Sequence, residues 1–122
     1  MCGISGFLRF SKDLCKDDLH KYGEKMSSTL INRGPNSSGI WIDDQYGLSL
    51  SHRRLSIIDL SDLGNQPMIS SNKKFILVYN GEIYNYLEIK DQLLRENISF
   101  KTYSDTEVVL EAVSYWGIEK TL

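Results

Sequence analysis

Hydrophobic positions in the first half of the chain predict three strands and one helix. Gly3–Arg9 is a short apolar run and predicts a strand. From Asp17 onward, apolar residues recur at intervals of three, four and four, as they do on one face of a helix. The residues of this face are Leu19, Tyr22, Met26 and Leu30. Arg33-Gly34-Pro35 is expected to stop the helix, because glycine and proline together break it. Two more strands are expected, at Ile40–Ile42 and Leu48–Ser51.

The middle of the chain predicts a hairpin. Phe75–Tyr79 is the most hydrophobic stretch and predicts a central strand. Asn80-Gly81 follows it directly and is a strong hairpin signal, so a return strand is expected to begin at Ile83 and Tyr84. Before this hairpin, Leu60–Ser71 contains glycine, asparagine and proline and is expected to be a loop.

The last third of the chain predicts two helices separated by a short strand. Apolar residues among lysines and glutamates predict a helix over 86–97, and Ile98–Thr102 predicts a strand. The spacing of Ser104 and Glu107 fits a capping box at the start of the second helix. This helix is expected to run through Trp116.

Composition and charge are those of an ordinary globular domain, and they narrow the range of partners. The 122 residues are 41% hydrophobic and 25% charged, with a net charge of −2. We therefore expect one domain, or a piece of one, with neither nucleic acid nor a membrane as partner. Because no apolar run is long enough to span a bilayer and no signal-like leader is present, a cytoplasmic location is expected.

The two cysteines predict neither a disulfide framework nor a metal site. Cys2 and Cys15 are too few for a framework, and with His20 and His52 they show no recognisable metal-binding spacing. Cys15 lies in a polar stretch and is expected to be a partly exposed thiol without a role.

The second residue carries the most specific chemistry in the sequence. Removal of Met1, which is normal when the next residue is small, would leave Cys2 with a free α-amine beside its thiol. The amine can then act as a base and the thiolate as a nucleophile. The alternative is an ordinary cysteine that behaves as a small hydrophobic residue.

Other stretches contain the groups that such a nucleophile would need. Asn80 and Gly81 combine a side-chain amide with a backbone N–H, the usual pair of donors for an oxyanion. Arg54 can bind a carboxylate in a bidentate manner, and Glu82 and Asp105 can receive an ammonium group. Glutamine has both charges and a cleavable amide.

Each of these residues also has a purely structural interpretation. Asn80-Gly81 is typical of a type I′ turn, and Arg54 could be a solvated surface arginine. Asp105 fits the first turn of a helix, where the dipole favours an acid, and Glu82 could be an ordinary exposed carboxylate.

Five motifs occur in order and together resemble a known family. They are Met1-Cys2-Gly3-Ile4-Ser5-Gly6, Arg33-Gly34-Pro35, His52-Arg53-Arg54-Leu55-Ser56-Ile57-Ile58-Asp59, Asn80-Gly81-Glu82-Ile83-Tyr84-Asn85 and Ser104-Asp105-Thr106-Glu107. Over essentially its whole length, the chain is similar to the glutamine-hydrolysing domain of class II amidotransferases, in the asparagine synthetase branch. The resemblance implies an α+β fold, the N-terminal-nucleophile hydrolase sandwich of two antiparallel sheets flanked by helices. The strands and helices predicted above are compatible with this fold.

The resemblance also implies a reaction and a role for each site residue. Cys2 would attack the side-chain amide of glutamine and form a γ-glutamyl thioester, which releases ammonia and then, with water, glutamate. Asn80 and Gly81 would form the oxyanion hole, and Arg54 would hold the α-carboxylate. The other implied substrate-binding residues are Leu55, Ser56, Ile57 and Ile58, which line the pocket with backbone groups, and Glu82 and Asp105, which face the α-ammonium.

The sequence departs from the family in one residue and in length. Asn36 stands where the family usually has aspartate, and a local effect is expected. Residues 1–122 would be the N-terminal part of the glutaminase domain, without the ATP-dependent synthetase domain. We therefore expect no cofactor in this chain, with ATP and magnesium used only by the absent synthetase domain. That domain would receive the ammonia for an asparagine-synthetase-like amide transfer, with aspartate as the default acceptor.

Two rival interpretations remain open from the sequence. The first is an inactive, truncated or partner-dependent module, whose unpaired sheet edge would favour self-association into a homo-oligomer. The second is an N-terminal-nucleophile hydrolase that acts on another amide. The charges at Arg54 and Asp105 argue against the second interpretation, because they suit a free amino acid.

Overall fold

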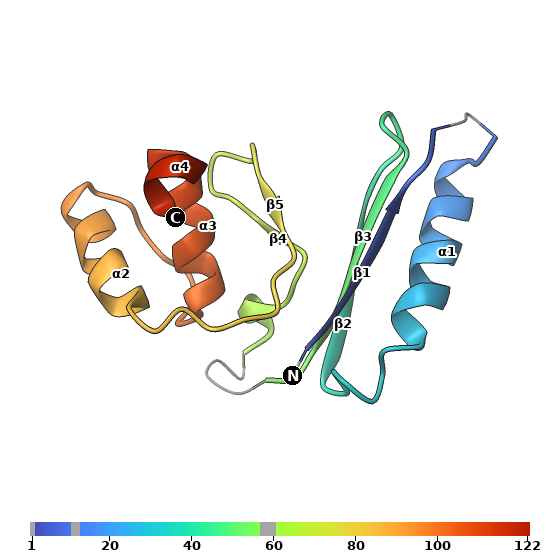
Figure 1. Cartoon of the computed structure of the whole chain (residues 1–122), viewed down its shortest axis with the longest axis horizontal. Coiled ribbons are helices and arrows are strands. Elements are labelled where there is room, and N and C mark those ends of the chain that lie inside the picture. The colour runs from blue at the N-terminus through green and yellow to red at the C-terminus, as the bar shows by residue number, and fades with distance from the viewer. Residues whose placement is uncertain (1, 11–12, 57–60) are drawn as a thin grey trace. The chain divides into compact units, whose positions relative to one another are not determined.

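A computed structural model describes residues 2–10, 13–56 and 61–122 of the chain. The protein is α+β, with antiparallel strands and helices, as expected (Figure 1). The described residues divide into two compact units. The first contains residues 2–56, 65–67 and 78–80, and the second contains residues 61–64, 68–77 and 81–122.

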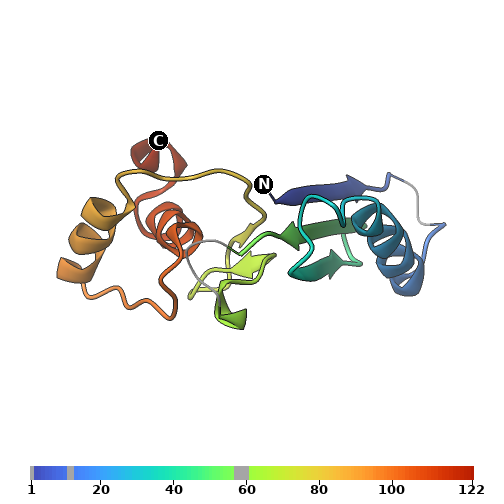
Figure 2. The same cartoon turned by 90° about the horizontal axis from the view of Figure 1, so that it is seen from below.

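The first unit is a three-stranded antiparallel sheet with one helix. The strands are β1 (Gly3–Leu8), β2 (Ser37–Asp43) and β3 (Leu48–Arg54), in the order β1-β3-β2. Both views show the helix α1 (Lys16–Ser28) running along the sheet, and it contacts all three strands (Figures 1 and 2). The three strands predicted for this region are confirmed, and β2 and β3 extend beyond their predicted ends.

The helix α1 forms where it was predicted, but it buries a different face. Leu19 is fully buried, and the other buried positions are Gly23 and Ser27. Tyr22 and Met26, which the periodicity placed on the buried face, remain 45% and 36% exposed. Small side chains let the helix approach β3 closely, since a Cβ at Gly23 would lie 2.5 Å from the Ser49 hydroxyl oxygen.

Cys15 caps the start of α1 and so has a structural role that the sequence did not suggest. Its backbone N–H and its thiol each lie 3.1 Å from Oδ2 of Asp18, which accepts both hydrogen bonds. The thiol and backbone hydrogen bonds from Cys15 lower the pKa of Asp18 below its ordinary value. The expected exposure of Cys15 is confirmed.

The second unit packs helices around a small apolar core. Its elements are a 3₁₀ turn (Asp62–Gly64), the strands β4 (Met68–Ile69) and β5 (Ile76–Leu77), and the helices α2 (Tyr86–Arg95), α3 (Asp105–Trp116) and α4 (Ile118–Thr121). The core contains Leu93 from α2 with Val108 and Ala112 from α3. The helices α2 and α3 are confirmed close to their predicted positions.

The predicted hairpin at Asn80-Gly81 is wrong. β5 is only two residues long and pairs with β4, which precedes it, so the turn of the observed hairpin lies between Ser70 and Phe75. Ser70 stabilises this turn because its hydroxyl accepts the N–H of Phe75 at 3.0 Å and bonds Asn72 at 2.8 Å. Phe75–Tyr79 is accordingly not a central strand, and the predicted loop Leu60–Ser71 contains β4.

The predicted strand at Ile98–Thr102 is also wrong, for a reason that lies in α3. The carboxylate of Glu107 accepts the backbone N–H groups of Lys101 and Thr102 at 2.9 and 2.7 Å, so these groups need no partner strand. The capping box is therefore half formed. Ser104 caps the helix by accepting the N–H of Thr106 at 3.1 Å, as predicted, but the Glu107 side chain bonds the preceding loop.

Candidate functional site

Cys2 lies at the start of β1, next to the end of β3. Its side chain is half-buried, and the backbone N–H of Leu55 donates to Sγ over 3.3 Å. The sulfur also lies 3.7 Å from the carbonyl oxygen of Leu55. Antiparallel pairing of Gly3 with Arg53 brings these distant parts of the sequence together. The structure therefore fixes the Cys2 sulfur against the backbone of Leu55.

The Arg33-Gly34-Pro35 turn holds the backbone on both sides of this contact. The Nε–H of Arg33 donates to the carbonyl oxygen of Cys2 at 3.2 Å, and Arg53 donates to the carbonyl oxygen of Gly34 at 3.1 Å. Position 34 requires glycine, because a Cβ there would lie 2.2 Å from the backbone of Arg53. Local sequence patterns predicted only that this turn stops a helix, because its long-range contacts depend on residues distant in the sequence.

Asn36 brackets Leu55 from both sides. Its backbone N–H donates to the carbonyl oxygen of Arg54, and its Oδ1 accepts the N–H of Ser56, each at 3.0 Å. An aspartate could accept the second hydrogen bond in the same way. The departure from the family at this position thus preserves the contact that shapes the Leu55 backbone.

Arg54 is buried rather than on the surface. It is 8% exposed at the end of β3, and Nη1 donates to Oδ1 of Asn65 at 3.1 Å. The same amide oxygen accepts the hydroxyl of Ser37 at 2.7 Å. The amide oxygen of Asn65 thus orients the guanidinium and adds no formal charge of its own.

Asn80 belongs to the same unit as Cys2 and is exposed. The peptide of the preceding Tyr79 is bonded by two buried side chains, His52 and Gln66. Burial lowers the pKa of His52 below its ordinary value of 6.5, and the charge of Arg54 adds to this effect, whereas the hydrogen bond to Tyr79 opposes it.

The other predicted site residues belong to the second unit. Gly81 and Glu82 are exposed, and Asp105 is 7% exposed in the first turn of α3. Oδ2 of Asp105 accepts the backbone N–H of Ile83 at 2.9 Å, so this carboxylate holds the segment that follows Glu82. The predicted residues Ile57 and Ile58 lie outside the described residues.

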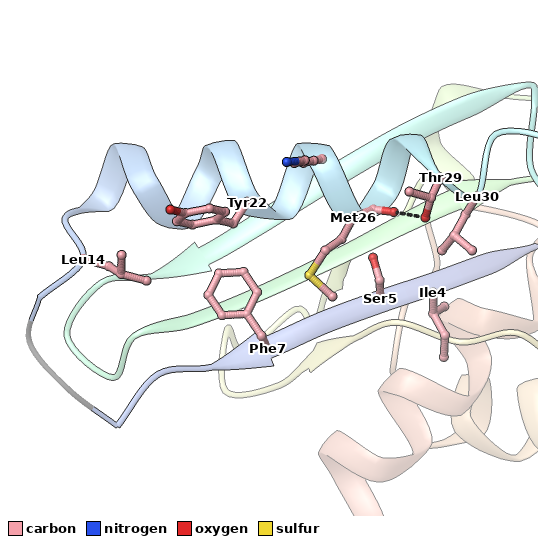
Figure 3. Close-up of a pocket in the computed structure, with 9 residues that line it drawn as sticks. Ile4, Ser5, Phe7, Leu14, Tyr22, Met26, Thr29 and Leu30 are labelled. Carbon is pink, nitrogen blue, oxygen red and sulfur yellow. Dashed lines mark hydrogen bonds between the residues drawn. The ribbon is translucent and has the colours of Figure 1, made fainter.

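A separate apolar cavity of about 620 Å³ lies between α1 and β1 (Figure 3). It is lined by side chains that include Phe7 from β1 and Tyr22 and Met26 from α1, and neither Cys2 nor Arg54 lines it. Within the described parts of the chain, no cluster of three or more histidine, cysteine, aspartate or glutamate residues could hold a metal ion. None of the described helices is long and apolar enough to cross a membrane.

The fold and the site define an α+β protein whose second residue is a cysteine, held at the start of its first strand by distant backbone groups. The chain belongs to the family of glutamine amidotransferase domains, whose model matches residues 1–122. This is the family class that the five sequence motifs indicated.

Several relatives of the chain within this family are named asparagine synthetases. The chain is 38% identical to a putative asparagine synthetase (glutamine-hydrolyzing) of Methanocaldococcus jannaschii, over 98% of the chain and 25% of the relative. It is 34% identical to an asparagine synthetase (glutamine-hydrolyzing) of Bacillus subtilis, over 95% of the chain and 18% of the relative. It is also 36% identical to amidase chry2 of Gibberella zeae, over 97% of the chain and 18% of the relative. The chain thus spans about a fifth of the length of these relatives.

Proposed function

We propose that this chain hydrolyses the side-chain amide of L-glutamine, with Cys2 as the nucleophile. The observation that carries the proposal is the contact between the Cys2 sulfur and the N–H of Leu55, directly beside the buried Arg54. A nucleophile and a carboxylate-binding group on adjacent backbone suit an amino-acid substrate. Family membership and the names of the relatives support the same substrate.

The proposed reaction proceeds through a thioester. With Met1 removed, the α-amine of Cys2 takes the thiol proton, and the sulfur attacks the side-chain carbonyl carbon of glutamine. The carbon–nitrogen bond then breaks, and the leaving nitrogen takes the proton from the α-amine and departs as ammonia. Water attacks the γ-glutamyl thioester, which gives glutamate and restores the thiol.

The roles of the other residues follow from their chemistry. Arg54 holds the α-carboxylate, with the backbone of Leu55 and Ser56 beside it and with Ile57 and Ile58 as further pocket residues. Asn80, through its side chain, and Gly81, through its N–H, stabilise the oxyanion. The α-ammonium is received by Glu82 and Asp105.

The proposal extends to the domain and the longer protein. We assign residues 1–122 to the N-terminal part of an N-terminal-nucleophile sandwich. Because relatives of greater length are named asparagine synthetases, the ammonia is proposed to feed an amide transfer by a synthetase domain. ATP and magnesium would act in that domain, and none of the steps above requires them.

Ammonia release from glutamine tests this function. Protein whose intact mass shows that Met1 is removed should release ammonia and glutamate in equal amounts, and Cys2→Ala should abolish both, because alanine offers no nucleophile. The loss should be on the order of 10⁴-fold or more. Residual turnover near the parent rate in Cys2→Ala would refute the nucleophile. Absence of turnover in the parent would favour the rival interpretation of an inactive or partner-dependent module.

A further inference from the structure

The segment Val78–Asn80 follows β5 and lies outside the strands of the described residues. β5 ends at Leu77, and no regular secondary structure is assigned to the three residues after it. An oxyanion donor must nevertheless be held in place before the reaction, because its contribution depends on preorganisation. Side-chain contacts to the backbone next to Asn80 therefore bear directly on its position.

Two buried side chains bond the backbone of Tyr79, one residue before Asn80. Oε1 of Gln66 accepts the N–H of Tyr79 at 2.6 Å, and Nε2 of His52 lies 3.3 Å from the carbonyl oxygen of Tyr79. Since a carbonyl oxygen can only accept, Nε2 of His52 must carry the hydrogen. The N–H and the carbonyl oxygen of Tyr79 are thus both bonded by side chains from other segments.

Both side chains are themselves firmly anchored. His52 is 1% exposed on β3, where it pairs with Ile4 on one side and Gly39 on the other. Gln66 is 7% exposed, and its backbone packs directly on β2, because a Cβ at Gly39 would lie 2.2 Å from the Gln66 carbonyl oxygen. The sheet therefore provides a rigid support for the Tyr79 contacts.

The segments that contain His52 and Gln66 also position Arg54. His52 precedes Arg54 by two residues on β3, and Asn65, next to Gln66, accepts a hydrogen bond from Arg54 Nη1. The neighbouring amides of Asn65 and Gln66 therefore bond Arg54, which is proposed to bind substrate, and the backbone of Tyr79, which precedes the proposed oxyanion donor.

We propose that His52 and Gln66 are positioning residues that hold the backbone N–H and carbonyl of Tyr79 and so place the Asn80 side-chain amide for the oxyanion. The proposal rests on the proposed glutaminase function and adds two residues to it. Neither residue touches the reacting atoms. Because the oxyanion exists only after attack, loss of either contact should lower kcat and leave the KM for glutamine nearly unchanged.

Matched variants test the kcat effect. Gln66→Met keeps the size of the side chain but removes the acceptor, and a displaced oxyanion donor should lower kcat by about 10–100-fold. Asn65→Ala is the comparison, because it loses the contact to Arg54 and should mainly raise KM. A purely structural loss would not separate kcat and KM in opposite ways at adjacent residues.

The other end of the clamp provides an independent pair of variants. His52→Gln places an amide N–H near the position of Nε2 and should retain most of kcat, whereas His52→Leu removes the donor and should lower kcat like Gln66→Met. This pair decides the question if Gln66→Met fails to fold. Equal kcat values in the Gln and Leu variants would overturn the role of His52.

Amide hydrogen exchange gives a readout that needs no activity. The Tyr79 N–H should be protected in the parent and should exchange faster in Gln66→Met, while amides of β1 and β3 stay protected. Unchanged exchange at Tyr79, or an unchanged kcat in Gln66→Met beside an active parent, would overturn the positioning proposal alone. Equal ammonia release by the parent and Cys2→Ala would instead overturn the proposed function and the catalytic role of the clamp with it.

Discussion

The two units of this chain satisfy their backbone hydrogen bonds in different ways. In the first unit, a three-stranded ladder bonds the backbone of β1, β2 and β3, and polar side chains such as Asn36 and Gln66 hold the short segments around Cys2 and Asn80. In the second unit, the described strands are two residues long, and side chains of one helix replace the missing ladder.

That helix is α3, which carries three buried carboxylates. Asp105 accepts the N–H of Ile83, and Glu111 accepts the N–H and hydroxyl of Ser71 at 2.7 and 2.9 Å. Glu107 bonds the loop over 101–102. These contacts tie three separate loops to one helix. Substitutions near Cys2 should therefore change activity, whereas substitutions of Glu107 and Glu111, which have no proposed contact with the substrate, should change stability.

Glu107→Ala should have the largest effect on stability and tests whether the α3 carboxylates stabilise the fold. The carboxylate is 5% exposed, and its loss leaves the buried N–H and hydroxyl of Thr102 without their acceptor. We expect the free energy of unfolding to fall by about 3 kcal/mol, measured by urea denaturation. Asp91→Ala, at an exposed position of α2, is the control and should change stability by less than about 0.5 kcal/mol. If Glu107→Ala changed the free energy of unfolding as little as Asp91→Ala, the carboxylate of Glu107 would not stabilise the fold.

The matching test in the first unit is Arg54→Ala. Loss of a charged hydrogen-bonding group from the carboxylate should raise the KM for glutamine by about 10–100-fold. Arg95→Ala removes an equal charge from the exposed C-terminal end of α2 and should leave KM unchanged. Thermal unfolding of both variants checks that the fold persists. If KM were the same in Arg54→Ala as in the parent, the carboxylate role would be wrong.

The smallest effect concerns the protonation of His52. Burial lowers its pKa in the folded chain below 6.5, so the unfolded chain binds more protons between pH 6.5 and the lower folded value. The contribution of neutral His52 to stability is thus fully present above pH 6.5 and is lost as the pH falls through this window. The slope from one such group is at most about 1.4 kcal/mol per pH unit.

Unfolding free energies of the parent and His52→Gln at several pH values measure this contribution. Glutamine does not titrate, so the loss of stability below pH 6.5 should be smaller in the variant than in the parent. Parallel pH dependences of the two proteins would show that His52 is charged equally easily in the folded and unfolded chains.

Local sequence patterns predicted the elements whose contacts are local or regularly repeated. The strands β1 to β3 and the helices α2 and α3 follow from hydrophobic periodicity and from Ser104 as a cap. The hairpin at Asn80-Gly81 failed because Ser70 stabilises an earlier turn and buried side chains take the backbone bonds of Tyr79. Local sequence propensity cannot predict such side-chain partners, because they are distant in the sequence.

The residues of the candidate site could be predicted from the sequence, but the contacts that hold them in place could not. Cys2 and Arg54 could be selected from their chemistry, and the motifs specified a family. The contacts of Arg33 and Asn36 could not be predicted, because Arg33 bonds a residue 31 positions away and Asn36 brackets a backbone 20 positions away. Such contacts depend on the pairing of β1 with β3, which periodicity does not define.

Covalent labelling tests whether the Cys2 sulfur, held against Leu55, attacks the side chain of glutamine. A glutamine analogue with a diazoketone in place of the amide would form a stable bond to that sulfur, and peptide mass spectrometry would locate it. We expect one adduct per chain, on Cys2, that excess glutamine prevents and that Cys2→Ala lacks. An adduct on Cys15, or no adduct on protein that lacks Met1, would contradict the role of Cys2 as the nucleophile.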